Sequence, residues 1–193
     1  MPDTKRADHS QSVKAMVDSD PSAGLFYIRN PNNPTDSVTS KEGIQRLIDN
    51  KPKASVFLPD EAYIHCFNAE KGTPWVGQSK DVIVLRTFSK LYSLAGMQLG
   101  MAMARPELAS KFMPYGPGSF VPVTALVAGT AGVKQQILVS DRARIYAETC
   151  GAVFEFLEKR KLAYVPSTTN FFMLETKRPG AELAAAIHEQ IQV

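Results

Sequence analysis

Three short segments hold the side chains of this sequence that are best suited to covalent chemistry. Residues 30–35 read NPNNPT, residues 60–63 read DEAY and residues 87–90 read TFSK. Each segment follows an apolar, strand-like run, and together they supply an amide, a carboxylate with a phenol, and an amine. An amine can form a Schiff base with an aldehyde, a carboxylate can keep a pyridine nitrogen protonated, and an amide and a phenol can hold a ring hydroxyl. The set therefore matches the needs of a pyridine aldehyde cofactor.

The three segments, in this order, resemble the pyridoxal 5'-phosphate (PLP) aminotransferases of fold type I, and most closely their histidinol-phosphate aminotransferase-like branch. The resemblance covers residues 24–176. It implies that Lys90 is the catalytic residue, which forms the Schiff base and then moves the proton between the substrate carbon and the cofactor carbon. By the same resemblance Asp60 holds the ring nitrogen, while Tyr63 and Asn33 hold the ring hydroxyl.

The implied cofactor-binding set is completed by two hydroxyls at the cofactor phosphate and comprises Asn33, Asp60, Tyr63, Thr87, Ser89 and Lys90. Each member also has an ordinary structural interpretation. Lys90 could be a surface lysine, Asp60 the cap of a turn, and Asn33 a turn former beside proline. Tyr63 could be a core tyrosine with a satisfied hydroxyl. A Thr or Ser at a strand end is usually structural.

Three positions depart from the pattern of the family. Gln98 stands where the family usually has an arginine that grips the phosphate, so a neutral amide replaces a bidentate, always-charged contact. Asp36 stands at a turn position that is usually glycine, where it fits less well and adds a charge. Pro59 directly precedes Asp60, and a proline in a central strand removes a ladder hydrogen bond.

The reaction implied by the resemblance is amino transfer between an amino acid and a 2-oxo acid, which are then the small-molecule partners. Chains of the family are longer on both sides, so we expect a piece of such an enzyme with impaired activity. Two alternatives stay open. One is a non-catalytic remnant of the fold that binds or regulates a partner, and the other is a PLP lyase or decarboxylase, because these enzymes share the fold and the cofactor residues.

Alternating strand-like and helical runs predict an α/β fold. By resemblance this is part of the PLP-transferase large domain, a mixed and mostly parallel sheet with flanking helices, followed by the start of the small C-terminal α+β domain. We expect a polar N-terminal segment at residues 1–23, the large-domain part at residues 24–140, and a connecting helix with the start of the small domain at residues 141–193.

The individual elements follow from apolar periodicity. Strands are predicted at residues 24–28, 54–58, 82–85, 98–104, 163–165 and 171–175. Helices are predicted at residues 13–17, 39–50, 106–113, 123–137, 141–161 and 181–191. Polar residues at the strand ends are where such folds bind ligands.

Composition narrows the possible partners and location. The net charge is +3, from 22 Lys and Arg against 19 Asp and Glu, and the basic residues are scattered, which argues against nucleic acid. Cys66 and Cys150 match no metal spacing and no disulfide framework, so we expect no metal and a reducing, cytoplasmic location. The apolar runs are too short to span a bilayer, so no membrane partner is expected. A homodimer is implied by the resemblance alone.

Overall fold

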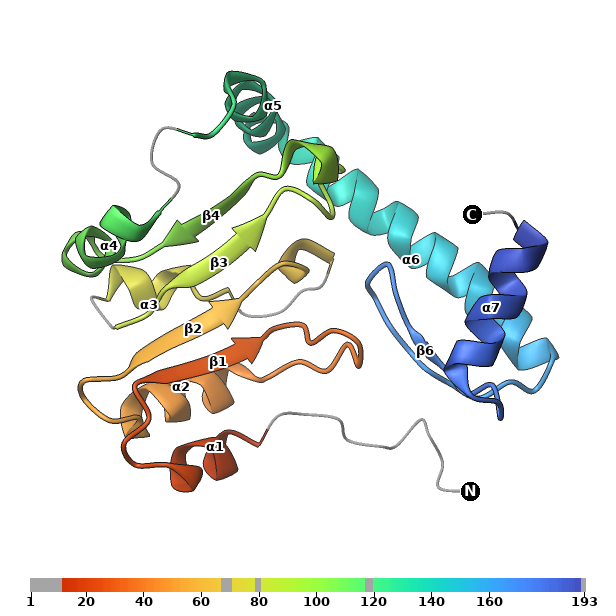
Figure 1. Ribbon diagram of the computed structural model, residues 1–193, viewed down its shortest axis with the longest axis horizontal. Coiled ribbons are helices and arrows are strands. Elements are labelled where there is room, and N and C mark those ends of the chain that lie inside the picture. Colours follow the sequence, from red (N-terminus) through yellow and green to blue (C-terminus); the bar gives the residue numbers. More distant parts are fainter. Residues whose placement is uncertain (1–11, 67–70, 79–80, 117–119, 192–193) are drawn as a thin grey trace.

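The computed structural model describes residues 12–66, 71–78, 81–116 and 120–191, and its centre is a sheet in the order β1–β2–β3–β4 (Figure 1). Strands β1 (Leu25–Arg29), β2 (Val56–Asp60) and β3 (Val84–Thr87) are parallel. Strand β4 (Gly100–Met103) pairs antiparallel with β3. The mixed, mostly parallel sheet predicted from the sequence is therefore confirmed.

Three helices cover one face of this sheet: α1 (Val13–Ser19), α2 (Lys41–Asn50) and α3 (Thr73–Gly77). Helix α2 begins after Ser40, whose hydroxyl accepts a hydrogen bond from the Gly43 N–H at 3.1 Å and so satisfies a donor of the first turn. The core lies between these helices and the sheet. Its buried members are Val13, Phe26, Ile28, Ile44, Leu47, Ile48, Phe57, Trp75, Val82 and Val84.

The opposite face of β1 is open. Phe26 and Ile28, which face the helices, are 3% and 0% exposed, whereas Leu25 and Tyr27, which alternate with them, are 56% and 39% exposed. This alternation follows from the period of two along a strand. In β2 the half-buried positions include Asp60, which lies on the same open side. Any ligand of that carboxylate therefore approaches from the uncovered face.

Pro59 interrupts the pairing between the two central strands. The Phe57 N–H donates to the Asp81 carbonyl and the Glu61 N–H donates to the Leu85 carbonyl, both at 2.9 Å. Pro59 lies midway between these bonds and has no N–H to continue the series. The ladder between β2 and β3 is accordingly short, and the loss of a ladder bond expected from the sequence is confirmed.

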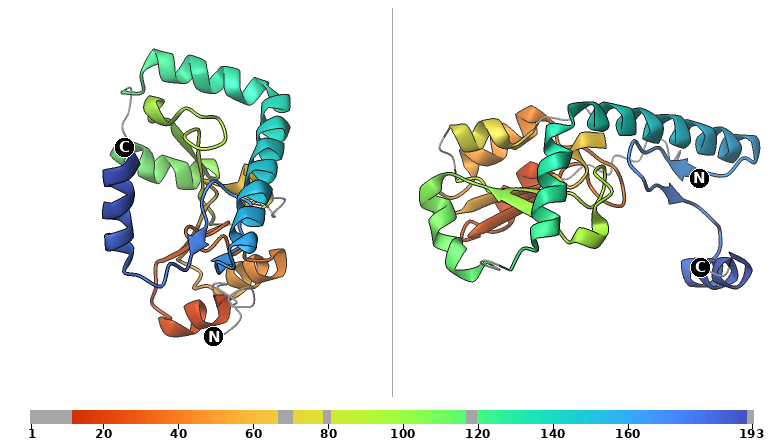
Figure 2. Two further views of the ribbon diagram at one scale, coloured as in Figure 1. Left: turned by 90° about the vertical axis from the view of Figure 1, so that its right-hand side faces the viewer. Right: turned by 90° about the horizontal axis from the view of Figure 1, so that it is seen from above.

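After β4, the chain forms α4 (Pro106–Phe112), α5 (Val123–Lys134) and α6 (Gln136–Lys159). The prediction of one helix over residues 123–137 is wrong, because α5 ends at Lys134 and α6 already begins at Gln136. Gln135 has φ −91° and ψ 76°, which lies outside the helical region and turns the chain. Figure 2 shows the resulting change of direction between α5 and α6.

Helix α6 leads from the sheet to a small antiparallel pair, β5 (Tyr164–Val165) and β6 (Met173–Leu174). Leu157 of α6 is buried, and the Phe154 ring stacks on the Tyr164 ring with centroids 4.6 Å apart. Helix α7 (Gly180–Ile191) has no buried residue among those described and stands apart from α6 in the view from above (Figure 2).

The other predicted elements exist with ends that differ by up to two residues, except that the helix expected at residues 141–161 begins five residues earlier, at Gln136. The strand expected at residues 171–175 is shorter than predicted, because β6 covers only Met173–Leu174. The sequence did not indicate α3 or the short 3₁₀ helices, which are η2 (Ile64–Cys66), η3 (Ala95–Met97) and η4 (Met113–Tyr115). The domain boundaries at residues 23 and 140 stay a prediction. Of the helices in the described parts of the chain, none has the length and apolar character that crossing a membrane requires.

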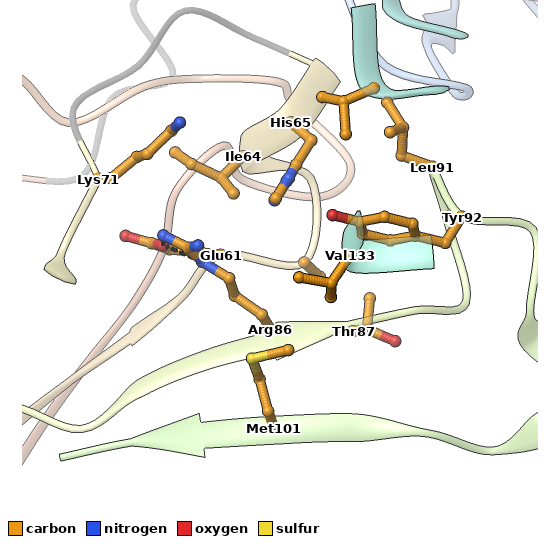
Figure 3. Close-up of a pocket in the computed structure, with 12 residues that line it drawn as sticks. Glu61, Ile64, His65, Lys71, Arg86, Thr87, Leu91, Tyr92, Met101 and Val133 are labelled. Carbon is orange, nitrogen blue, oxygen red and sulfur yellow. Dashed lines mark hydrogen bonds and ion pairs between the residues drawn. The ribbon is translucent and has the colours of Figure 1, made fainter. Parts of the chain in front are cut away.

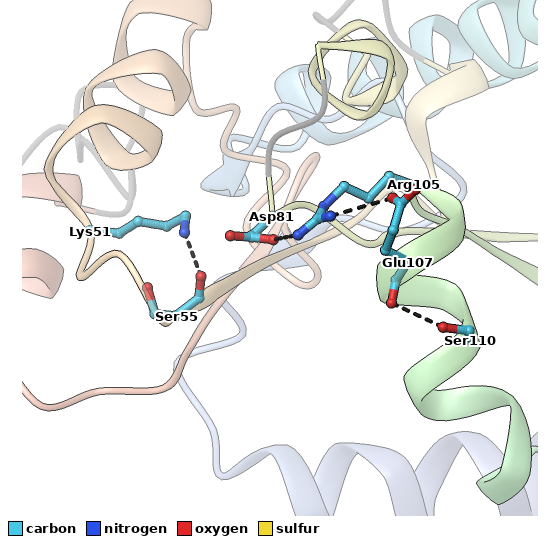
Figure 4. Close-up of polar contacts among 6 residues, drawn as sticks. All are labelled: Lys51, Ser55, Asp81, Arg105, Glu107 and Ser110. Carbon is cyan, nitrogen blue, oxygen red and sulfur yellow. Dashed lines mark hydrogen bonds and ion pairs between the residues drawn. The ribbon is translucent and has the colours of Figure 1, made fainter.

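An ion pair closes the far end of the β3–β4 pair (Figure 4). Arg105 Nη2 lies 2.7 Å from Asp81 Oδ1, and Arg105 Nη1 lies 3.4 Å from Glu107 Oε2. Asp81 precedes β3 and Arg105 follows β4, so the pair ties the start of one strand to the end of its neighbour. The hydrogen bond from Arg105 lowers the pKa of the Asp81 carboxyl. This end of the sheet lies opposite the carboxyl ends of β1, β2 and β3.

Gly72 offers a test of how tightly α3 packs on the sheet. A Cβ at this buried position would lie 2.8 Å from Val84 Cγ2 and 2.9 Å from Glu61 Oε1, whereas a Cβ at Gly77 would meet nothing within 4 Å. We expect Gly72→Ala to lower the free energy of unfolding by about 1–3 kcal/mol through overpacking. The control Gly77→Ala should change it by about 0.5 kcal/mol or less. Urea denaturation of both variants measures this, and equal midpoints would contradict the packing described.

Candidate functional site

The carboxyl ends of β1, β2 and β3 meet at one edge of the sheet, and the three predicted segments lie there. Parallel strands bring their following loops together, so residues far apart in sequence become neighbours. A pocket of about 230 Å³ lies at this edge and is lined by Arg29, Pro31, Asn33, Asp60, Ala62, Tyr63 and Lys90. Of the six predicted site residues, four therefore line a single pocket.

Asn33 and Tyr63 present their polar groups to each other across the pocket. Asn33 Nδ2 lies 3.4 Å from Tyr63 Oη. The loop that carries Asn33 is held by Asn30, whose side-chain oxygen accepts from the Thr39 N–H at 2.9 Å, and by Arg29, whose Nη1 donates to the Asn33 carbonyl at 3.0 Å. The loop of Asn33 is thus held from behind, and Asn33 Nδ2 and Tyr63 Oη lie close enough to face one ligand oxygen together.

Asp60 accepts two hydrogen bonds from the protein. Tyr27 Oη donates to Asp60 Oδ2 at 2.7 Å, and the Ala62 N–H donates to Asp60 Oδ1 at 3.1 Å. A carboxylate offers about four lone-pair sites, so acceptor capacity remains for a ligand N–H. Burial raises the pKa of the Tyr27 phenol, which stays neutral and able to donate. The two hydrogen bonds thus orient the Asp60 carboxylate and leave acceptor sites free for a ligand.

Lys90 follows β3 in a tight turn. The Ser93 N–H donates to the Lys90 carbonyl at 2.9 Å. Arg142 of α6 donates through Nη1 to the Leu91 carbonyl at 2.7 Å and to Ser93 Oγ at 2.5 Å. The Lys90 ammonium lies 5.6 Å from the centroid of the Tyr63 ring, which is within cation–π range. The amine is thereby placed over the same phenol that Asn33 approaches.

The neighbouring residue Glu61 points into a second cavity, of about 360 Å³, on the other side of the sheet (Figure 3). Successive side chains of an extended segment alternate between faces, so Asp60 and Glu61 serve different cavities. Arg86 Nε donates to Glu61 Oε2 at 2.8 Å, and Arg86 Nη2 lies 2.8 Å from the same oxygen without hydrogen-bond alignment. The Gly72 N–H also donates to Glu61. Burial raises the pKa of Glu61, and these two partners oppose the rise.

His65 points into this second cavity beside the Tyr92 ring, with the ring centroids 5.6 Å apart (Figure 3). Neither of its ring nitrogens has a hydrogen-bond partner among the described residues. Burial, with the positive charges of Arg86 and Lys71, lowers the pKa of His65 to about 4. The imidazole is therefore neutral at physiological pH.

The remaining predicted residues lie outside the first pocket. Thr87 lines the second cavity, and its hydroxyl accepts the Ser89 N–H at 3.0 Å. Ser89 lines neither cavity. Gln98 is exposed, has φ 50°, and its Nε2 donates to the Ala95 carbonyl of its own turn at 2.7 Å. The assignment of Thr87 and Ser89 to a phosphate stays a prediction.

Sequence reasoning missed Tyr27 and Arg29. Arg29 Nε donates to Tyr27 Oη at 3.0 Å, and Tyr27 in turn donates to Asp60, so the three form one hydrogen-bonded chain. A signal was present, because Tyr27 and Arg29 alternate along a strand that ends at the asparagine loop. What the sequence could not give is the register, which pairs Arg29 with Asp60.

Comparison with known proteins matches this chain to aminotransferases. The family model for aminotransferase class I and II matches residues 4–193. The chain is 30% identical over 184 residues to histidinol-phosphate aminotransferase of Bacillus cytotoxicus, an alignment that covers 91% of this chain and 49% of that protein. The chain spans about half the length of the curated relatives it matches.

Solved structures share the fold. Histidinol-phosphate aminotransferase from Sinorhizobium meliloti in complex with pyridoxal-5'-phosphate matches with a TM-score of 0.76 and 26% identity, covering 88% of this chain and 46% of that one. L-threonine-O-3-phosphate decarboxylase from Porphyromonas gingivalis matches with a TM-score of 0.75 and 21% identity, covering 86% and 51%. The similarity to the decarboxylase, at 21% identity, shows a shared fold and nothing more.

His65 gives a pH-dependent prediction. Its pKa in the folded chain, about 4, lies below the ordinary value of 6.5, so between these values the unfolded chain binds more protons. We therefore expect the free energy of unfolding to fall as the pH is lowered from 6.5 toward 4. His65→Gln should lessen this fall, while His188→Gln, which removes an exposed histidine, should not. Urea denaturation at pH 7 and pH 5 decides it, and parallel curves for wild type and His65→Gln would refute the burial effect.

Proposed function

This chain belongs to the aminotransferase class I and II family, and we propose that it binds pyridoxal 5'-phosphate and takes part in amino transfer between an amino acid and a 2-oxo acid. The observation that carries the proposal is the pocket at the strand ends, where an amine, a carboxylate, a phenol and an amide converge. The residues that bear these groups are Lys90, Asp60, Tyr63 and Asn33.

The donor and acceptor chemistry of the pocket fits the cofactor. Asp60 keeps lone pairs for a pyridinium N–H after accepting from Tyr27 and Ala62. Asn33 Nδ2 and Tyr63 Oη approach each other closely, which suits two donors that share one ring oxygen. Lys90 brings a primary amine to the same lining. These residues are therefore the proposed binding set, with Thr87 and Ser89 proposed for the phosphate.

When bound, PLP supplies an aldehyde for the lysine amine and a ring that withdraws electrons from the reacting carbon. The chain's own residues have distinct tasks in this proposal. Asp60 keeps the ring nitrogen protonated, and Tyr27 keeps Asp60 oriented. Asn33 and Tyr63 orient the ring through its hydroxyl. Lys90 Nζ would be the base that accepts and returns the proton during amino transfer.

Self-association, a cytoplasmic location and the division into a large domain and the start of a small domain belong to the same proposal. Exposed apolar side chains support self-association, because surfaces of this kind are usually covered. They include Leu25 on the open face of β1 and Val123, Leu126 and Val127 on α5. The two free cysteines, Cys66 and Cys150, are compatible with a reducing compartment.

A non-catalytic role is the second candidate, and Gln98 favours it. An exposed amide that bonds to its own turn gives a weaker phosphate contact than an arginine. Weak cofactor binding would leave the fold intact while reducing activity. The lyase and decarboxylase alternatives use the same cofactor residues, so they share the test of Lys90 and differ only in the product formed.

The assignment of Lys90 leads to a direct test. Wild type incubated with PLP should gain a visible absorption band, and borohydride should then fix the cofactor mass on the peptide that contains Lys90. Lys90→Ala should show neither, because the amine is absent. Lys71→Ala is the matched control, since Lys71 lines the second cavity and should leave both signals intact. Adduct formation in Lys90→Ala at the wild-type level would falsify the assignment.

The weakened phosphate contact is tested by Gln98→Arg. An arginine can add a charge-assisted hydrogen bond to a phosphate, so we expect the dissociation constant for PLP to fall about tenfold or more. Gln78→Arg adds the same charge at an exposed position at the end of α3 and serves as the control. Titration followed by absorbance compares the variants. Equal affinities in all three proteins would mean that residue 98 does not face the phosphate.

A further inference from the structure

Asp36 occupies the turn position where the family usually has glycine, and it contacts a segment far away in the sequence. The Thr168 N–H donates to Asp36 Oδ2 at 2.6 Å, and Thr168 Oγ1 donates to the same oxygen at 3.1 Å. Hydrogen bonds to an ionised acceptor are roughly twice as strong as neutral ones. One carboxylate oxygen thus joins the loop after β1 to the segment between β5 and β6.

Two features of Asp36 are energetically unfavourable, namely its backbone conformation and the burial of its carboxyl group. Asp36 has φ 54°, in the left-handed region that favours glycine. Its carboxyl group is half-buried, and burial raises its pKa, while the hydrogen bonds from Thr168 oppose that rise. A strained backbone and a desolvated carboxylate both disfavour Asp36 unless its contacts compensate. The two bonds to Thr168 satisfy Asp36 Oδ2 and offset part of these costs, whereas Asp36 Oδ1 is buried and has no hydrogen-bond partner among the described residues.

Both sides of the contact are fixed to larger elements. In the loop, the Asp36 N–H donates to the Asn32 carbonyl at 2.7 Å, so the turn that contains Asn33 is closed. In the other segment, Ser167 Oγ and Thr169 Oγ1 are 2.8 Å apart, and Cys150 Sγ of α6 donates to the Thr169 carbonyl at 3.2 Å. The contact therefore connects the asparagine loop to α6.

A second contact joins the same two parts of the chain. The Phe171 ring packs edge-on against the Tyr63 ring, with centroids 4.9 Å apart and planes at 81°. Tyr63 in turn faces Asn33 at 3.4 Å. These contacts, together with the covalent chain between them, form a closed loop that passes through Asp36, Thr168, Phe171, Tyr63 and Asn33. The segment that holds Thr168 and Phe171 therefore contacts both the loop of Asn33 and the ring of Tyr63.

We propose that Asp36 is a positioning residue that holds residues 166–171 against the loop of Asn33 and so sets the spacing between Asn33 and Tyr63. The contact of Asp36 and the spacing between Asn33 and Tyr63 are properties of the chain without any ligand. Only their consequence for affinity rests on the proposed function, because Asn33 and Tyr63 are the proposed holders of the cofactor ring.

Amide hydrogen exchange of the full chain, followed by NMR, tests the contact. Asp36→Gly removes the carboxylate and accepts the left-handed backbone, and Asp36→Asn keeps the size and loses the charge. We expect the Thr168 amide to exchange about tenfold faster in Asp36→Gly, with an intermediate rate in Asp36→Asn. The Thr39 amide, which donates to Asn30 in the same loop, should keep its rate. Asp49→Asn, an exposed charge change on α2, is the matched control. Equal Thr168 rates in wild type and Asp36→Gly overturn the contact.

The spacing is tested with and without cofactor. In the cofactor-free chain, the side-chain amide resonance of Asn33 should shift in Asp36→Gly and stay in place in Asp49→Asn. An unshifted resonance together with faster Thr168 exchange overturns the positioning role. In PLP titrations, Asp36→Gly should bind severalfold more weakly than wild type. Unchanged affinity also overturns that role, whereas a wild type that binds no PLP refutes the proposed function and leaves the resonance test valid.

Discussion

The site depends on the hydrogen bonds that align the carboxyl ends of three parallel strands. The Asn30 N–H donates to the Asp60 carbonyl, and the Glu61 N–H donates to the Leu85 carbonyl, each at 2.9 Å. These two bonds lie at the point where strands give way to loops, so they fix the starting position of every segment that carries chemistry. Displacing β1 by one residue along β2 would turn Tyr27 to the helical face and leave Asp60 without its phenol donor.

Alternation along the chain then separates the two acidic neighbours. Asp60 faces the open side, where it retains acceptor capacity, while Glu61 faces the helices and is occupied by Arg86 and Gly72. Buried carboxylates are tolerated when they are paired, and the ion pair to Arg86 meets that condition. The same alternation explains why Pro59, directly before Asp60, is buried against the core while its neighbours are not.

Much of this arrangement could be predicted from the sequence. Asn33, Asp60, Tyr63 and Lys90 follow apolar runs, and the rule that parallel strands gather their loops was enough to place them together. The sequence could not supply the register, so Tyr27 and Arg29 went unnoticed although they reach Asp60 and Asn33. It also could not show that Thr87 and Ser89 hydrogen-bond to each other, or that a backbone break at Gln135 divides one apolar run into two helices. These omissions concern contacts between strands, one local hydrogen bond and a single pair of dihedral angles, none of which periodicity encodes.

Helix α6 has a mechanical consequence. It contains 24 residues, and at 1.5 Å per residue it is a rod of about 36 Å. Arg142 attaches it near one end to the turn that follows Lys90. The part of the helix from Arg142 to Lys159 is about 26 Å long, so a rotation of about 5° at that attachment would displace the far end by about 2 Å. A small rotation of α6 at its contact with the turn after Lys90 therefore produces a larger displacement at its other end, next to β5 and β6.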